Sequence, residues 1–295
     1  MRIAVTGASG RLGRSVYATL SSRGHEVLGV DLDLSRPCCD VAADLRDPAE
    51  TYAWMARLRP DAVVHLAGLP TPFSRAEHVL FATNTLMSFQ VCQAAADLGV
   101  GVVVCASSPT VIGYGNPSGW APARLPIDET HPVRPWHAYA MSKVAIEDVV
   151  RGFAARADAG ARFLTFRPCY VVAPEDWTSP VEGQSGHTMT QRLADPELAA
   201  VSLFNYIDAR DAAELVALMC ENTEAVPNGD VLFAGAADAL ARAPLAELLP
   251  TFHPSTARFA DVLTGDRPAF SSAKAAALLG WAPRHSWRSE LATPA

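Results

Sequence analysis

The feature that most constrains this 295-residue chain is a glycine-rich turn close to its N-terminus. An apolar run at residues 3–6 is followed by Gly7, Gly10 and Gly13, and a segment with helical periodicity starts near Leu12. Glycines at this spacing allow a tight turn, a close approach of the backbone to a phosphate, and close packing of helix against strand. The phosphate would face the unpaired N–H groups of the helix N-terminus. The pattern therefore predicts a strand–turn–helix unit that binds a dinucleotide.

Strands and helices are expected to alternate along the first half of the chain. Apolar runs at residues 26–30, 62–66 and 102–105 predict buried strands, and helical stretches near 49–58 and 86–98 lie between them. This alternation implies a parallel sheet covered on both faces. We predict an α/β fold, a Rossmann-type doubly wound parallel sheet with a small, discontinuous C-terminal lobe. In this prediction residues 1–168 bind the dinucleotide, and residues 169–295 mainly bind substrate, with some segments returning to the core.

Composition excludes several other classes of protein. The net charge is −7, without a clustered basic face, which argues against nucleic acid as a partner. No apolar run approaches the roughly 20 residues of a membrane helix. The six cysteines are scattered, and no Cys/His group has the spacing of a zinc site. Because the N-terminus also enters a strand without a leader, we expect a cytoplasmic enzyme with no structural metal and no membrane contact.

Asp31 is expected at the end of the second strand, close to the spacing of a carboxylate that binds the adenosine ribose hydroxyls. A carboxylate there would repel a 2′-phosphate, so NAD is favoured over NADP. Arg11 and Arg36 are candidate phosphate partners and keep NADP open. Asp44, with Leu45, could border the adenine, or Asp44 could simply cap a helix or a turn.

A tyrosine and a lysine four residues apart point to the chemistry. The chain has only two lysines, and Lys143 follows Tyr139 by about one helical turn, so both side chains share a helix face. A free phenol, with a pKa of about 10, is a poor base at neutral pH. Lys143 and the cationic oxidised nicotinamide would both favour the phenolate and lower the pKa of Tyr139. Ser108 should orient the reacting oxygen, with Ser107 and Thr110 as alternatives.

Together these residues resemble the extended short-chain dehydrogenase/reductase family, which includes nucleotide-sugar epimerases, dehydratases and sugar dehydrogenases. Further matches are His65-Leu66-Ala67-Gly68, Asn84, Ala106-Ser107-Ser108, Arg167-Pro168 and, near the C-terminus, Ser271–Lys274 and Leu278–Pro283. The resemblance implies that Ser108, Tyr139 and Lys143 are catalytic. It also implies a cofactor site made of Gly7, Ser9, Gly10, Arg11, Leu12, Gly13, Asp31, Asp44, Leu45, Leu66, Ala67, Gly68, Asn84, Tyr139, Lys143, Pro168 and Val171. Asn84 could equally cap a helix, and His65 could be a satisfied, half-buried histidine.

The departures from the family pattern narrow the reaction. Where the dehydratases carry an acidic pair, this chain has Pro109 and Thr110, so a water elimination at the sugar ring is not expected. Tyr170 stands where many nucleotide-sugar enzymes have an asparagine that contacts the substrate diphosphate, and Ala173 replaces a glycine of the same run. Tyr170 could instead line a pocket for a smaller substrate, or pack in the core.

The segment from about Tyr170 to Phe204 is rich in proline and glycine and is expected to form a loop or lid over the site. Arg192 and Arg267 are candidates to bind a substrate carboxylate or phosphate, or are ordinary surface arginines. Pro109, Thr110 and Tyr170 complete the candidate substrate contacts. Asp208 is expected to cap a helix.

The leading prediction is NAD(P)-dependent hydride transfer at a secondary alcohol or ketone of a sugar or sugar derivative. An epimerase would retain its cofactor, whereas a dehydrogenase or reductase would exchange it. The run from Ala106 to Tyr114 also looks like uronate dehydrogenases, apart from Pro109, which keeps a small non-nucleotide substrate open. A non-catalytic dinucleotide sensor is the remaining alternative. The resemblance implies a homodimer formed through the two helices that flank the active site.

Overall fold

The computed structural model describes residues 1–156, 160–179 and 186–292. Within these residues, seven parallel strands form one sheet in the order β3-β2-β1-β4-β5-β6-β9. The strands are β1 (Arg2–Thr6), β2 (Glu26–Asp31), β3 (Val41–Ala42), β4 (Ala62–His65), β5 (Val102–Ala106), β6 (Arg162–Pro168) and β9 (Val231–Ala234). Two further strands, β7 (Val171–Val172) and β8 (Ile207–Asp208), pair with each other in parallel. The predicted Rossmann-type α/β fold is confirmed.

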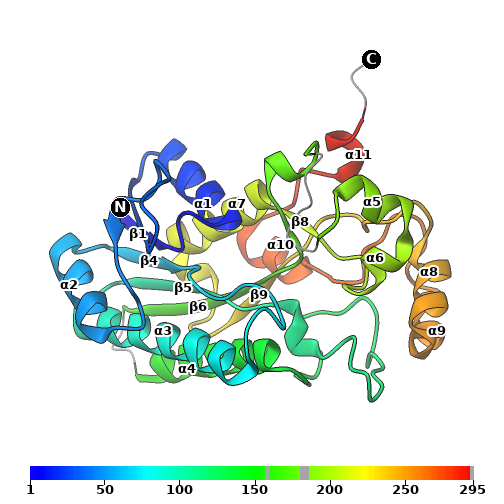
Figure 1. Cartoon of the computed structure of the whole chain (residues 1–295), viewed down its shortest axis with the longest axis horizontal. Helices are drawn as coiled ribbons and strands as arrows, with labels where there is room; N and C mark the ends of the chain where they lie inside the picture. Colours follow the sequence, from blue (N-terminus) through cyan, green and yellow to red (C-terminus); the bar gives the residue numbers. More distant parts are fainter. Residues whose placement is uncertain (157–159, 180–185, 293–295) are drawn as a thin grey trace.

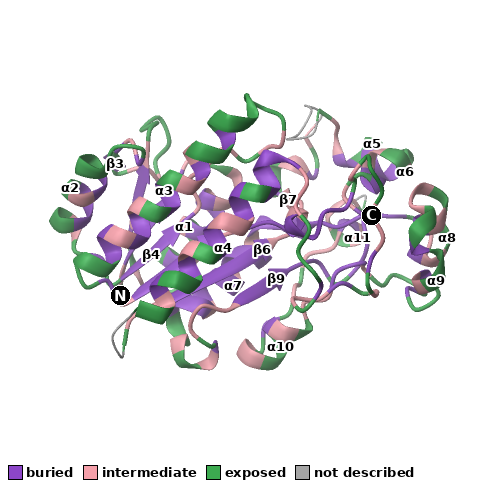
Figure 2. Ribbon diagram, turned by 90° about the horizontal axis from the view of Figure 1, so that it is seen from below, coloured by how far each residue is buried: buried purple, intermediate pink, exposed green. Residues whose placement is uncertain are grey.

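Helices cover both faces of the sheet, which explains why its central strands are buried along almost their whole length (Figures 1 and 2). One face is covered by α1 (Arg11–Ser22), α7 (Ala209–Glu221) and α10 (Ala273–Leu279), and the other by α2 (Pro48–Leu58), α3 (Glu77–Asp97) and α4 (Ala138–Arg156). The buried apolar side chains accordingly divide into two clusters, one on each face. The two layers hold the sheet rigid, so the carboxyl ends of its strands form a fixed platform for a site.

The remaining helices gather at one end of the molecule, on the right of Figure 1. They are α5 (Met189–Ala194), α6 (Pro196–Ala200), α8 (Leu245–Phe252), α9 (Ala257–Ala260) and α11 (Trp287–Glu290). The short 3-10 turns are η1 (Pro109–Ile112), η2 (Pro174–Asp176), η3 (Thr223–Ala225) and η4 (Pro254–Thr256). Of these, η3 lies by the amino end of β6, where Arg162 donates to the Thr223 carbonyl. The chain leaves the sheet after β6 and returns as β9, which pairs with β6. Segments before and after β9 therefore build this lobe. No helix in the described part of the chain is both long and apolar enough to cross a membrane.

One helix boundary and one segment differ from what the sequence predicts. Helix α3 begins at Glu77, nine residues before the predicted start, because Val79 and Phe81 lie exposed on its first turns and do not produce a one-sided apolar pattern. The segment expected to be irregular contains α5 and α6. The first of these starts with a capping box made by Thr188 and Gln191, a signal that the sequence reading missed. Residues 180–185 of this segment, including Pro180 and Gly183, lie outside the described residues.

Candidate active site

The glycine turn has the shape that its sequence predicts. Gly7 has a φ of +70°, and a Cβ there would lie 2.7 Å from the backbone nitrogen of Ala67. A Cβ on Gly13 would lie 2.1 Å from the Gly7 carbonyl oxygen, so only glycine allows helix α1 to pack this closely. A Cβ on Gly10 would meet only the Gly7 carbonyl oxygen within 4 Å. The backbone at the helix N-terminus is therefore open to a phosphate, and the turn fits a dinucleotide.

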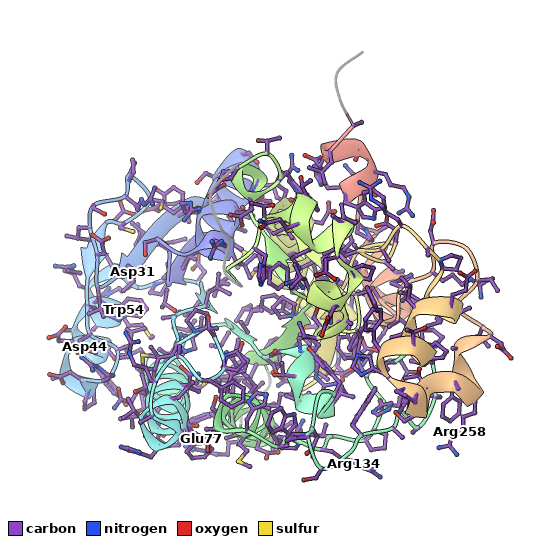
Figure 3. All side chains as sticks on the ribbon, turned by 45° about the vertical axis from the view of Figure 1, so that its right-hand side comes forward. Asp31, Asp44, Trp54, Glu77, Arg134 and Arg258 are labelled. Carbon is purple, nitrogen blue, oxygen red and sulfur yellow. The ribbon has the colours of Figure 1, made fainter. Side chains whose placement is uncertain are left out.

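Asp31 connects the end of β2 to this turn. Its Oδ2 accepts hydrogen bonds from the Ser9 backbone nitrogen at 2.9 Å and from the Ser9 hydroxyl at 2.7 Å. Figure 3 shows Asp31 and Asp44 in the N-terminal part of the molecule, on the opposite side from Arg258. The carboxylate is thus fixed beside the dinucleotide turn, where it was expected to receive the ribose hydroxyls.

Other candidate cofactor residues already have protein partners. The Arg11 Nε donates to Asp176 of η2 at 2.9 Å, so this side chain links the first turn of α1 to the C-terminal lobe. Asp44 accepts hydrogen bonds from the backbone and the guanidinium of Arg46, which supports the turn-capping alternative and lowers the pKa of the Asp44 carboxyl. The next carboxylate along the chain, Asp47, is the one that caps a helix, at the N-terminus of α2.

Asn84 lies within α3 and does not cap it, which excludes the capping alternative. The side-chain amide accepts a hydrogen bond from the Leu69 nitrogen at 2.7 Å and donates to the Leu69 carbonyl and to the Ser142 hydroxyl. Its Oδ1 would lie 3.2 Å from a Cβ on Gly68. Asn84 therefore fixes the loop after β4, which includes Leu66, Ala67 and Gly68, against helix α4.

His65 is the last residue of β4. Both of its ring nitrogens have hydrogen-bond partners in the protein, which favours a structural role over a functional one. Its Nδ1 lies 2.8 Å from the Thr6 hydroxyl, and its Nε2 lies 3.1 Å from the Ser88 hydroxyl. Burial, together with the positive charge of Lys143, lowers the pKa of His65 to about 3. The ring is therefore neutral and supports the platform beneath the site.

Tyr139 and Lys143 lie one turn apart near the start of α4, as the spacing predicts. Tyr139 is only 9% exposed. The Lys143 Nζ donates to the Ala106 carbonyl at 2.9 Å and lies 5.6 Å from the centre of the Tyr139 ring. The bond to Ala106 holds the ammonium at the carboxyl end of β5. Both side chains are thus fixed beside the strand that leads to Ser108.

The pKa of Tyr139 is raised in this structure, whereas the sequence predicts that Lys143 and an oxidised nicotinamide together lower it. Burial raises the pKa of Tyr139 to about 12, and the hydrogen bond with Ser108 acts in the opposite direction. Burial also lowers the pKa of Lys143 to about 8, against the influence of Cys105 and Glu147. Burial is the largest influence on both groups, and it favours the neutral phenol and the neutral amine. Burial thus favours the protonated form of the Tyr139 phenol.

Of the three candidate hydroxyls, only Ser108 is bonded to Tyr139. The Ser108 Oγ also accepts from the Thr110 hydroxyl at 3.0 Å, so Thr110 supports it. The Ser107 hydroxyl points elsewhere and donates to Glu147 at 2.6 Å. Pro109 starts the η1 turn directly after Ser108 and is buried. The geometry therefore supports Ser108 as the residue that orients the substrate oxygen.

Tyr170 and Arg192, two of the candidate substrate residues, are brought together. The Arg192 guanidinium lies 4.5 Å from the centre of the Tyr170 ring, and its side chain is buried. Burial lowers the pKa of Arg192. Tyr170 follows β6, two residues after Pro168 and one before Val171, at the same edge of the sheet as Ser108. The pair therefore belongs to the lobe side of the site.

Asn205 and Tyr114 link this pair to Tyr139, and the sequence predicts neither as a site residue. The Asn205 Oδ1 accepts from the Tyr170 nitrogen at 2.8 Å, and its side chain also bonds Tyr114. Burial is the main cause that raises the pKa of Tyr114, with a smaller effect from Tyr139. Asn205 precedes an apolar pair and belongs to no sequence motif. Its role could therefore be recognised only from the structure.

Arg267 lies apart from these residues. It lines a cavity of about 340 Å³ together with Pro126, Leu263, Phe270 and Trp281, and none of Ser108, Tyr139, Tyr170 or Arg192 contributes to that lining. Its guanidinium donates to the Val262 carbonyl at 3.3 Å. The structure thus separates Arg267 from the other substrate candidates. In the described part of the chain, no three His, Cys, Asp or Glu residues gather in a way that could hold a metal ion.

Residues 3–235 match the NAD dependent epimerase/dehydratase family. The chain belongs to this family. A UDP-glucose 4-epimerase of Corynebacterium glutamicum is 26% identical to this chain, and the match spans 97% of this chain and 92% of that protein. An uncharacterized protein of Mycobacterium tuberculosis, strain H37Rv, is 40% identical over 112 residues, but these span only 37% of this chain and 12% of that longer protein.

Solved structures of similar proteins share the fold. The UDP-glucose-4-epimerase of Stenotrophomonas maltophila, crystallized with NAD and formylated UDP-arabinopyranose, superposes with a TM-score of 0.71 at 21% identity. The match covers 97% of this chain and 94% of that one. At this identity the likeness establishes the fold alone, and the reaction has to be argued from the residues.

Proposed function

We propose that this protein uses NAD to move hydride to or from a secondary alcohol or ketone of a sugar or sugar derivative, with Tyr139 as the acid/base. The observation that carries the proposal is the contact of Tyr139 with Ser108 on one side and its position over Lys143 on the other, at the carboxyl end of β5. Membership of an NAD-dependent family and the open glycine turn support it.

The glycine turn and Asp31 would hold the dinucleotide, through its phosphates and its adenosine ribose respectively. NAD, when bound, supplies the hydride acceptor or donor. Ser108 would bind the substrate oxygen, and Tyr139 would give it a proton during reduction or remove one during oxidation. The raised pKa of Tyr139 suits proton donation, so oxidation depends on Lys143 remaining an ammonium that stabilises the phenolate.

Retention of the cofactor distinguishes an epimerase from a dehydrogenase or reductase. Freshly purified protein should be denatured, and any released dinucleotide identified by mass spectrometry and counted per chain. Near-stoichiometric NAD supports an epimerase, and screening then starts with nucleotide sugars. An empty site that binds added NAD reversibly supports a dehydrogenase or reductase, and screening starts with simple sugars and ketones.

A second candidate is a dehydrogenase or ketoreductase for a small, non-nucleotide substrate such as a uronate. The stacked Tyr170 and Arg192 pair favours it, because an arginine cation lies on the lobe side of the site where family members use an asparagine for the diphosphate. With a uronate as substrate, Arg192→Met should raise KM strongly. The Arg267→Met variant, altered in the separate cavity, is the matched control and should leave KM unchanged.

The two helices that flank the site also support a homodimer. Large apolar side chains are exposed along α3 and α4: Phe81, Leu86 and Phe89 on the first and Met141 on the second. Sedimentation equilibrium should give twice the 31.4 kDa chain mass. Replacement of Leu86 and Phe89 by glutamate should give the monomer, whereas glutamate at the exposed Val201 of the lobe should not.

A further inference from the structure

Glu147 lies on the same face of α4 as the two proposed catalytic residues. It follows Lys143 by four residues and Tyr139 by eight, and these positions are stacked along one side of a helix. Its side chain is 2% exposed. A carboxylate at such a position has to obtain its hydrogen bonds from the protein, because removing a charge from water is costly.

Its hydrogen-bond partners lie at the ends of two strands, and Arg151 of α4 adds an ion-pair contact, with its Nη1 3.8 Å from the Glu147 Oε2. The Glu147 Oε1 accepts from the Ser107 hydroxyl at 2.6 Å and from the Arg167 Nε at 2.8 Å, and its Oε2 accepts from the Arg167 Nη2 at 2.8 Å. Arg167 is also 2% exposed, and its guanidinium lies 5.2 Å from the centre of the Phe233 ring. The pair is thus a two-pronged, fully buried ion pair.

The network joins the three elements that carry the site. Ser107 directly precedes Ser108 after β5, Arg167 lies at the end of β6 close to Tyr170, and Glu147 belongs to the helix of Tyr139. A buried ion pair of this kind is weak evidence for stability, since apolar residues of the same volume often stabilise a protein equally well. Its placement points instead to a role in holding these elements in register.

The same carboxylate lies one helical turn after Lys143 on α4, and its negative charge raises the pKa of Lys143. The titratable groups near the ammonium are Cys105 of β5, His65 of β4, and Tyr139 and Glu147 of α4 itself. His65 stays neutral because burial lowers its pKa to about 3. Glu147 is the carboxylate of this group. Its negative charge raises the pKa of Lys143, whereas burial lowers it.

We propose that Glu147 is a positioning residue for the reaction: its carboxylate fixes the Ser107–Ser108 segment against Tyr139 and supplies the negative charge that Lys143 faces from its own helix. This inference rests on the proposed function for the roles of Tyr139 and Ser108. The effect on Lys143 is a property of the protein alone and can be measured without a substrate.

The ionisation of Lys143 can be measured without signal overlap because the chain has only two lysines. Protein labelled with 13C-lysine gives Cε signals from Lys143 and Lys274 alone, and the chemical shift of each reports its ionisation. Glu147→Gln should move the titration midpoint of Lys143 to lower pH, because a negative charge that favours the ammonium is lost. Lys274, paired with Asp230 at 2.6 Å, is the internal reference and should not move.

Asp211→Asn is the matched control, since Asp211 is another buried carboxylate on a helix that covers the sheet. It should leave the Lys143 midpoint at its wild-type value. Because Glu147→Gln leaves Arg167 buried without its full charge partner, the double variant Glu147→Gln/Arg167→Met is measured as well. The result is taken from whichever of the two variants folds. If its Lys143 titration midpoint equals that of the wild type, Glu147 does not act on the charge of Lys143 and this part of the proposal is wrong.

Ser107 tests the positioning part while leaving the ion pair intact. Ser107→Ala should lower kcat about tenfold, the loss expected for one buried hydrogen bond, with KM and NAD affinity unchanged. Ser107→Thr keeps the hydroxyl and should restore kcat. Equal kcat values in wild type and Ser107→Ala overturn the positioning role. If Tyr139→Phe keeps full turnover, the proposed function fails, but the Lys143 titration still decides the role of Glu147.

Discussion

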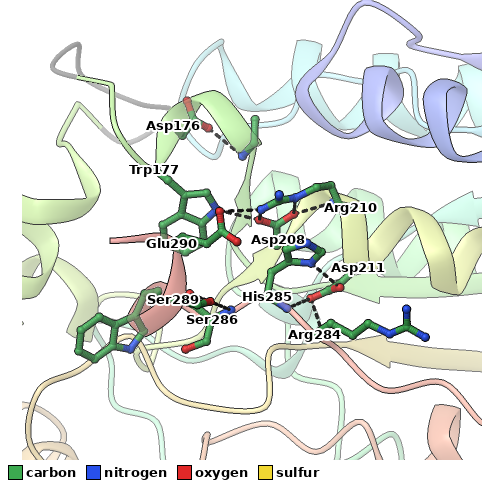
Figure 4. A network of polar contacts seen from close by, with 12 residues as sticks. Asp176, Trp177, Asp208, Arg210, Asp211, Arg284, His285, Ser286, Ser289 and Glu290 are labelled. Carbon is green, nitrogen blue, oxygen red and sulfur yellow. Dashed lines mark hydrogen bonds and ion pairs between the residues drawn. The ribbon is translucent and has the colours of Figure 1, made fainter. Parts of the chain in front are cut away.

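Glu147 and Asp211 are both buried carboxylates on helices that cover the sheet, one on each face. Glu147 binds side chains at the ends of two strands. Asp211 binds the C-terminal segment instead: its Oδ2 accepts from the backbone nitrogens of Arg284 and His285, and its Oδ1 lies 2.8 Å from the His285 Nδ1 (Figure 4). Similar burial thus serves two purposes. One network surrounds the proposed chemistry, and the other attaches the end of the chain to the core.

Neighbouring residues extend the second network without approaching Tyr139. Asp208 caps α7, as the sequence predicts, and also accepts from the Trp177 indole at 2.7 Å and from Arg210. Arg210 in turn pairs with Glu290 of α11 at 2.9 Å. These contacts connect the lobe, the core and the C-terminal helix (Figure 4). The two networks therefore differ in their partners and also in burial, because Arg210, His285 and Glu290 are partly exposed whereas Glu147 and Arg167 are not.

The largest expected difference is between two buried tyrosines. Tyr139→Phe should lower turnover by about 10²–10⁴-fold, the usual contribution of general acid–base catalysis, while NAD still binds. Tyr206 also has a buried hydroxyl, bonded to Asp238 and to the Trp287 nitrogen in the C-terminal network. Tyr206→Phe should keep its turnover and lose stability. Comparable turnover losses in both variants would remove the distinction between the networks.

Asp211→Asn should reduce the free energy of unfolding by about 2 kcal/mol, because the charge-assisted hydrogen bonds to two backbone N–H groups are weakened. The measurement is the urea midpoint at constant m-value. Asp261→Asn, at an exposed position, is the control and should change stability very little. A kcat that falls in proportion to stability would show that this network also acts on the chemistry.

The dinucleotide half should show its own pH dependence through His65. The unfolded histidine takes up a proton below about pH 6.5, whereas folded His65 does so only near pH 3. Its stabilising contribution is thus complete above pH 6.5 and falls as pH decreases toward 3, with a slope of up to about 1.4 kcal/mol per unit. His65→Asn should lose this slope in urea titrations at several pH values. Parallel pH curves for the two proteins would contradict the assignment.

The smallest expected effect concerns cofactor choice. Asp31→Asn should weaken NAD binding about threefold to tenfold, since a neutral amide accepts the ribose hydroxyls less strongly, and should improve NADP binding by removing the repulsion of the 2′-phosphate. Asp33→Asn, two residues further along the exposed loop, is the control. Fluorescence titrations with NADH and NADPH give both affinities. An unchanged ratio of the two would mean that Asp31 serves only to hold Ser9.

The sequence predicted the fold of the N-terminal half well because local patterns determine it. The glycine spacing, the apolar strands and the Tyr139/Lys143 interval each depend on neighbours within a few residues. The contacts of Glu147, Asn205 and Asp211 escaped prediction because their partners are 20 to 74 residues away in the chain. The raised pKa of Tyr139 was not predicted for a related reason: it is caused by burial, which depends on the whole fold and cannot be inferred from the spacing of Tyr139 and Lys143.

The return of the chain to form β9 has a consequence for how such a protein can be altered. The 62 residues between β6 and β9 begin and end at two strands that are hydrogen-bonded neighbours. Exchange or lengthening of this insert need not change the distance between its two attachment points. Because the insert also carries α7, which packs beside α1 on one face of the sheet, an exchange that keeps the core intact has to retain α7 and vary only the segments of the lobe. A fragment cut after β6 would instead expose an unpaired strand edge and invite aggregation.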